Sequence, residues 1–235
     1  MIAAAPLLAL GLAAAAPADT AADRALTARE ARFRFPAPAR LAPALAAIGR
    51  AARCPAPPRP IAAWPAAGDP GLLAAILTQG ARGGWVVVAG GCGPLLQLRL
   101  IARSDGGLDL APFARGAGLA WPSLVAEALP MARAAAATLL PHGCPDARRT
   151  DGHIVAIDPG LAPRRHGIRA TGGWREAWRL EGCGGAASIP LDFVALGRGQ
   201  ARVHLAYADA RRLPLGGGAA GSPAADAYGP VRYGR

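Results

Sequence analysis

The sequence of 235 residues contains no lysine and no asparagine, so every basic side chain is an arginine. Without lysine the chain cannot form a Walker loop, whose lysine contacts the phosphates of the ligand. The glycine-rich segment Gly90-Gly91-Cys92-Gly93 also lacks the helical pattern that would follow such a loop. Ala, Arg, Gly and Pro dominate the composition, and because their codons are GC-rich, we attribute much of this bias to genome composition.

Serine is scarce as well, and no catalytic signature surrounds the few that occur. Nucleophilic catalysis needs a positioned Ser, Cys or Thr beside a base. No serine lies in a G-x-S-x-G motif, and Gly221-Ser222-Pro223 is typical of a linker. A Rossmann glycine fingerprint and an H-E-x-x-H motif are also absent. The sequence therefore predicts no cofactor and favours a non-catalytic protein.

No apolar run is long enough to cross a bilayer, so no transmembrane span is expected. The uncharged run from Ile2 to Ala16 is short and rich in alanine, and it continues into Pro17-Ala18. Small residues at positions −3 and −1 before Asp19 predict signal-peptidase cleavage after Ala18. An apolar N-terminal helix of the fold is the alternative. We predict a signal peptide at 1–18 and a periplasmic or secreted protein.

The net charge is +11, but the arginines are scattered along the chain. The only short clusters outside the C-terminal segment are pairs: Arg148-Arg149, Arg164-Arg165 and Arg211-Arg212. A basic surface can attract anionic polymers, whereas this scatter favours an ordinary solvated surface. We expect another envelope protein or an anionic polymer as partner and do not expect nucleic acid, and the oligomeric state stays open.

Four short motifs occur twice in the same order, at offsets of 89 to 91 residues. Trp and Cys are rare in this chain, with five and four residues, and both recur in register. We therefore predict a tandem duplication. The matched motifs are Cys54-Pro55 with Cys144-Pro145, Asp69–Leu72 with Asp158–Leu161, Gly83–Trp85 with Gly172–Trp174, and Cys92-Gly93 with Cys183-Gly184.

Helical patterns precede each Cys-Pro motif. Leu41, Leu45, Ile48 and Ala52 recur at helical spacing, and the alanine-rich segment from Pro130 to Leu140 is the counterpart. The proline after each cysteine disfavours helical geometry at the cysteine, so each helix should end there. Each Asp-Pro-Gly motif predicts a turn.

After each Gly-Gly-Trp motif the apolar spacing changes to that of strands. Trp174, Glu176, Trp178 and Leu180 should share one face of a strand. The expected strands are Ile61–Trp64, Trp85–Val88, Leu95–Ala102, Leu108–Ala111, His153–Ile157, Trp174–Leu180, Ser188–Leu196 and Gln200–Tyr207.

These elements predict an α+β fold of two tandem units, each a helix packed on an antiparallel sheet of three to four strands. Unit one spans residues 39–120 and unit two residues 121–212. A partly helical lead-in at 19–38 precedes them. A disordered tail at 213–235 follows them, because that segment has no periodicity and little apolar bulk.

Four cysteines in an exported protein predict two disulfides. A metal site is the alternative, but no C-x-x-C spacing occurs and the four histidines do not cluster with the cysteines. Of three possible connectivities we favour pairing within each unit, because a single-unit ancestor would already have contained both partners. The predicted bonds are Cys54–Cys92 and Cys144–Cys183.

The segment Gly173–Trp178, with the motif Trp174-Arg175-Glu176-Ala177-Trp178 followed by Cys183-Gly184 and a strand, resembles a pattern in uncharacterised exported bacterial proteins. The resemblance covers about forty residues and implies an exported protein with strand structure, with no known activity. The expected architecture of paired, disulfide-linked units is also similar to that of secreted β-lactamase inhibitors, although no motif is shared.

Glu176 is the most notable candidate residue, because its carboxylate falls between two tryptophans on one strand face. It could be a general acid or base in an aromatic groove. Pairing with an arginine, or partial exposure of that face, is the interpretation we favour. An enzyme would require Glu176 in one pocket with His153, Asp192 or His204. No metal site is expected from these residues, because no spacing requires the histidines to converge.

The leading hypothesis is an exported, non-catalytic envelope protein that acts as a binding or interaction module. It predicts a contiguous apolar or basic patch on the surface. An exported hydrolase-like enzyme with its site in unit two, and an inhibitor of a secreted enzyme, are the alternatives.

Overall fold

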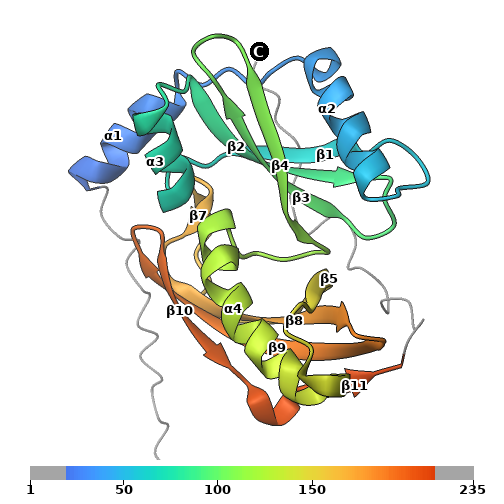
Figure 1. Cartoon of the computed structure of the whole chain (residues 1–235). Helices are drawn as coiled ribbons and strands as arrows, with labels where there is room; N and C mark the ends of the chain where they lie inside the picture. Colours follow the sequence, from blue (N-terminus) through green and yellow to red (C-terminus); the bar gives the residue numbers. More distant parts are fainter. Residues whose placement is uncertain (1–19, 215–235) are drawn as a thin grey trace, which may run out of the picture.

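The computed structural model describes residues 20–214, so the predicted signal peptide lies outside the described residues, as does the predicted tail from residue 215. Two antiparallel sheets with helices packed on them form an α+β fold as predicted (Figure 1). Within residues 20–214 no helix is long and apolar enough to cross a membrane.

The first half is built on a four-stranded sheet with the order β1-β2-β3-β4. All its neighbouring strands are antiparallel. Its elements are α1 (Ala21–Glu30), α2 (Pro38–Ala51), β1 (Arg59–Pro65), α3 (Pro70–Thr78), β2 (Gly83–Gly90), β3 (Leu96–Ala102) and β4 (Leu108–Arg115).

The second half is built on a five-stranded sheet with the order β10-β9-β8-β5, in which β11 also pairs with β9. A separate two-stranded hairpin, β6-β7, projects from the connection between β5 and β8. The elements of the second half are α4 (Pro122–Leu139), β5 (Arg148–Ile157), β6 (Arg164–Arg165), β7 (Ile168–Arg169), β8 (Gly172–Gly182), β9 (Gly185–Gly197), β10 (Gln200–Leu205) and β11 (Arg211–Leu213), with short 3₁₀ turns at Pro141–Gly143 and Tyr207–Asp209.

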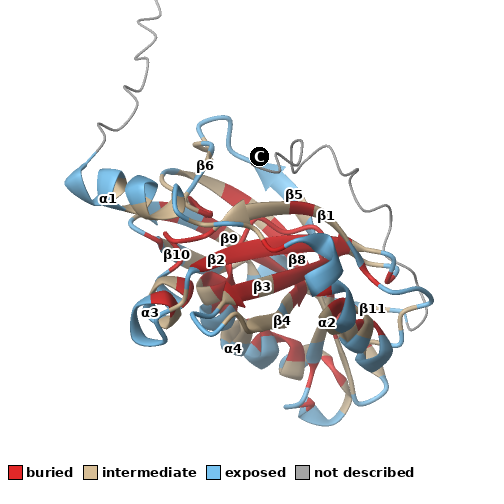
Figure 2. Cartoon of the chain, turned by 90° about the horizontal axis from the view of Figure 1, so that it is seen from above, coloured by how far each residue is buried: buried red, intermediate tan, exposed pale blue. Residues whose placement is uncertain are grey.

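The central strand of the first sheet, β2, is buried on both faces (Figure 2). On one face, Trp85 and Val87 pack with Leu41 and Leu45 of α2. On the other face, Val86 packs with residues of the β1–α3 connection, α3 and β3, which form a smaller core. Because strand side chains alternate, a run of consecutive apolar residues supplies both cores.

The second core lies between α4 and the second sheet. Trp174, Trp178 and Phe193 from β8 and β9 pack with Leu124 and several alanines of α4. The indole ring of Trp174 stacks on Phe193, with ring centroids 5.1 Å apart and an interplanar angle of 11°. The alanine-rich face of α4 allows the helix to approach these large rings closely.

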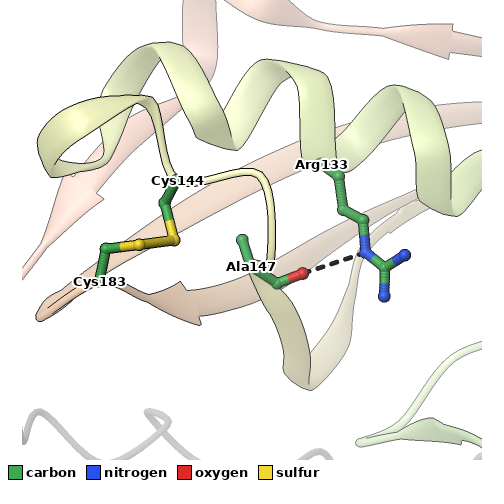
Figure 3. The surroundings of a disulfide bond; sticks show 4 residues. All are labelled: Arg133, Cys144, Ala147 and Cys183. Carbon is green, nitrogen blue, oxygen red and sulfur yellow. Dashed lines mark hydrogen bonds between the residues drawn. A yellow bond between two sulfur atoms is a disulfide. The ribbon is translucent and has the colours of Figure 1, made fainter.

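The two disulfides pair the cysteines as predicted, Cys54 with Cys92 and Cys144 with Cys183. In each half the bond joins the segment after a helix to the end of a central strand. Figure 3 shows the second bond below the end of α4, where Nε of Arg133 donates to the carbonyl of Ala147 at 3.0 Å. The helix and the sheet are thereby joined covalently and by a hydrogen bond.

Two local predictions were wrong. Asp69-Pro70-Gly71 begins a helix, because Asp69 is the N-cap of α3 and Pro70 its first residue. At Asp158 the same motif makes the predicted turn, with Oδ1 accepting from the backbone N–H of Gly160 at 2.7 Å. The helix predicted from Pro130 instead begins at Pro122 and continues through Pro130.

Two assignments in the second half also change. The second sheet has five strands, one more than the three to four expected. The additional strand is β11, which pairs Leu213 with Ala186, so the predicted tail cannot begin at residue 213. Sequence periodicity missed β11 because a three-residue strand is too short to display one.

Candidate functional site

Glu176 is fully buried beneath the segment that leads into α4. Its Oε1 accepts from the backbone N–H groups of Leu119 and Ala120, at 2.6 and 2.9 Å, and from Nε1 of Trp174 at 2.9 Å. Its Oε2 accepts from Nε1 of Trp178 at 2.8 Å. The carboxylate thus holds the connection between the two halves onto the second sheet.

Arg149 supplies the positive charge beside this carboxylate. Its Nη2 lies 3.8 Å from Oε2 of Glu176, and its guanidinium lies 4.0 Å from the ring centroid of Trp178. A Cβ on Gly118 would lie 2.7 Å from Oε2 of Glu176, so the covering segment touches the carboxylate. Glu176 therefore has no open side toward a substrate, and its contacts match the arginine-paired interpretation.

The structure does not bring Glu176 together with the other three candidates. Asp192 lies opposite Arg175 on the neighbouring strand. Because Arg175 is adjacent to Glu176 in sequence, the side chains of Arg175 and Asp192 lie on the other face of the sheet from Glu176. His204 lies opposite Asp192, and His153 lies opposite Ala177, so both belong to that outer face. The active site hypothesised from these residues is wrong, because the sheet separates them.

Asp192 already has a partner on the outer face. Arg175 donates from Nε and Nη2 to its two carboxylate oxygens, at 2.6 and 2.9 Å, and from Nη1 to Asp209 at 3.1 Å. The side-chain hydrogen bond and the charge of Asp192 raise the pKa of Arg175 above its usual range. In the part of the chain that the structure describes, no group of three or more His, Cys, Asp and Glu could hold a metal.

A contact that the sequence did not predict joins α1 to the second half. Glu30 Oε2 lies 2.8 Å from Nδ1 of His166, on the β6-β7 hairpin. Glu30 Oε1 accepts from the backbone N–H of Ala67 at 3.1 Å. Both side chains are mostly buried, 15% and 11% exposed. One carboxylate thus fixes α1 to both halves, although α1 itself contains no buried residue.

A concave site lies between α1 and α3. This arginine-lined pocket has a volume of about 530 Å³, within the usual range for small-molecule sites. Residues of α1 and the segment after it form one wall, and α3 with the connection from α3 to β2 forms the other. The lining residues are Ala25, Ala28, Arg29, Arg32, Phe33, Ile76, Ala81 and Arg82.

The floor of the pocket is aromatic and packs against the core. Phe33 packs against Trp85, a buried core residue, with ring centroids 5.4 Å apart. Gly83 lies between them, and a Cβ there would be 2.4 Å from the Trp85 ring and 3.0 Å from Phe33. Only glycine lets the strand approach both rings at this position, so the Gly-Gly-Trp motif shapes the floor.

Arg29, Arg32 and Arg82 give the pocket three positive charges. No lining residue is acidic. Among residues 20–214 no carboxylate forms a salt bridge with these three arginines. A guanidinium offers a planar fork of N–H donors that matches carboxylate, sulfate and phosphate groups. The pocket therefore suits an anion.

No family matches. Comparison with protein-family models, curated proteins and solved structures finds no similar protein. The geometry of the pocket is therefore the basis for any functional proposal.

The pocket offers binding groups rather than a reacting centre. Its polar side chains are arginines, which offer N–H donors and positive charge. Sequence reasoning missed the pocket because the lining comes from two segments that lie about fifty residues apart. Ala25, Ala28, Arg29 and Arg32 recur at helical spacing, which is the one signal that sequence analysis could have used.

Proposed function

We propose that this chain is an exported binding protein whose arginine-lined pocket takes an anionic ligand. The single observation that carries the proposal is the concentration of Arg29, Arg32 and Arg82 around one concave, partly apolar space without an acidic lining residue. Charges that face a cavity with apolar walls attract an anion more strongly than the same charges scattered over an open surface.

Two features of the chain support export. The four cysteines form two disulfides, which persist in oxidising compartments. The sequence before Asp19 has the character of a signal peptide. These features support a location in the periplasm or outside the cell, where a small anionic molecule or an anionic group on a larger partner would be its ligand.

A tandem duplication remains our explanation for the two halves. The Gly-Gly-Trp motif begins β2 in the first half and β8 in the second. In each sheet this strand lies between an earlier and a later strand of the chain: β2 between β1 and β3, and β8 between β5 and β9. Both disulfides close loops of similar length, with separations of 38 and 39 residues. On this proposal the pocket arose in the first copy only, because both of its helices are specific to that copy. The helix α1 precedes the first unit, and α3 stands where the second unit has the turn at Asp158.

The test is calorimetric titration with inorganic pyrophosphate at low salt. The variant Arg29→Gln/Arg32→Gln/Arg82→Gln should bind at least tenfold more weakly than the natural chain. A matched control, Arg50→Gln/Arg59→Gln/Arg202→Gln, removes three exposed arginines outside the pocket and should change the affinity less than twofold. Equal losses in the two variants would mean that pyrophosphate responds to overall charge, and the pocket proposal would then fail.

A further inference from the structure

The pocket has an apolar part and a cationic part, in a fixed order along α1. Ala25 and Ala28 line it first, Arg29 follows in the last turn of α1, and Arg32 lies two residues beyond the end of the helix. Four residues of helix correspond to about 6 Å along the axis. The positive charges of this wall therefore lie toward one end, beyond two alanines that leave room beside the helix.

The opposite wall contributes the same two kinds of surface. Ile76 of α3 is buried and lines the apolar part, and Ala81 is followed directly by Arg82. Phe33 completes the apolar lining between the two walls. A simple inorganic anion would use the arginines and leave the exposed part of this apolar lining in contact with water, which forgoes the hydrophobic contribution.

We infer that the ligand is an amphiphile, a single apolar chain that bears a phosphate or similar anionic head. This inference rests on the proposed function and names the class of its ligand. The head pairs with Arg29, Arg32 and Arg82, and the chain lies against Ala25, Ala28, Phe33 and Ile76. A volume of about 530 Å³ suits one free molecule of this kind rather than a membrane surface.

A series of alkyl phosphates tests this inference directly. Inorganic phosphate, butyl, hexyl and octyl phosphate are titrated into the full chain, each below the concentration at which it forms micelles. Burial of a methylene group contributes about 0.8 kcal/mol, which is about fourfold in affinity. Affinity should therefore rise about tenfold or more for each two methylenes until the chain extends out of the pocket. Octyl glucoside, which is neutral, should bind at least tenfold more weakly than octyl phosphate.

A pair of variants on α1 locates the chain within the pocket. Ala28→Leu fills the apolar part and should weaken octyl phosphate binding at least fivefold while leaving inorganic phosphate unchanged. Ala22→Leu adds the same side chain at an exposed position of α1 outside the lining and should alter neither affinity. Urea unfolding of both variants verifies that each is folded.

The outcomes separate this inference from the proposed function. A flat chain-length series with binding that still depends on the three arginines overturns the amphiphile and leaves anion binding in place. Absence of binding by every phosphate overturns both. Sedimentation with phosphatidic acid vesicles, without binding of monomeric octyl phosphate, would identify a membrane surface as the ligand and also overturn the inference.

Discussion

The carboxylate of Asp69 accepts two hydrogen bonds from Ser123, which lies 54 residues later in the chain. Its Oδ2 accepts from the backbone N–H and from Oγ of Ser123, at 2.9 and 2.8 Å, while Oδ1 accepts from the backbone N–H of Leu72 at 2.7 Å. Asp69 therefore caps α3 of its own half and α4 of the other half. The negative charge also lies at the positive ends of two helix dipoles.

This double cap predicts a large effect of Asp69→Ala. Loss of a cap costs about 1 kcal/mol per helix, and the buried N–H groups lose their partner, so we expect a loss of about 2–3 kcal/mol in the free energy of unfolding. Urea denaturation followed by tryptophan fluorescence measures it. Asp158→Ala, in the matching motif, removes an exposed carboxylate that accepts from Gly160 and should cost below about 1 kcal/mol. Equal costs for the two variants would contradict the double cap.

Glu176→Gln should be more damaging than its conservative appearance suggests. The amide nitrogen would face either the indole N–H of Trp178 or the donors at Oε1, and Arg149 would lose its charged neighbour. Breaking a buried pair in this way costs about 3–5 kcal/mol. The control is Glu181→Gln on the same strand, which weakens a partly exposed pair with Arg179 and should cost below about 1 kcal/mol. Chemical denaturation of both proteins distinguishes this structural role from a surface role.

The disulfides should contribute comparable stability to the two halves. In the chain-entropy model, loops with separations of 38 and 39 residues each correspond to about 4 kcal/mol. Replacing either pair with alanine should lower the free energy of unfolding by nearly this amount. Peptide mapping of the unreduced protein should recover Cys54 linked to Cys92 and Cys144 linked to Cys183. Any peptide that links the first half to the second would contradict the structure.

Acid should weaken the capping box at the start of α1. The backbone N–H and the side chain of Thr20 donate to Asp23, and these bonds lower the pKa of Asp23 below its usual 3.8. A lowered carboxyl pKa stabilises the folded form above pH 3.8, and this contribution is lost as the pH falls through the lowered pKa. An NMR titration from pH 6 to pH 2 should show the Asp23 carboxyl titrating below pH 3.8, together with the shifts of the first turn.

Thr20→Val provides the control for this titration. The substitution removes the hydroxyl and keeps the backbone N–H, so the pKa of Asp23 should move part of the way back toward its usual value. If the natural chain and Thr20→Val titrate identically, the capping box does not hold in solution.

The regular elements could be predicted because their signals are local. Apolar residues at helical spacing indicated α2, and alternation of Trp174, Glu176 and Trp178 with charged residues indicated β8 and its buried face. The helix α3 was missed because Asp-Pro-Gly is compatible with both a turn and a helix start. The following residues separate the two outcomes: Leu72–Leu77 continue a helix, whereas Pro163 follows the second motif and disfavours one.

By itself the sequence predicted most of the elements and the faces of the strands, since apolar spacing records these directly. Its repeated motifs favoured the observed pairing of cysteines over the two other connectivities. Only the tertiary structure decided what the buried and charged groups do. It places Glu176 under Leu119, Glu30 against His166 and two segments of arginines around one pocket. These contacts join residues that lie tens to more than a hundred positions apart, and their geometry depends on how the helices pack on the sheets, which no local pattern specifies.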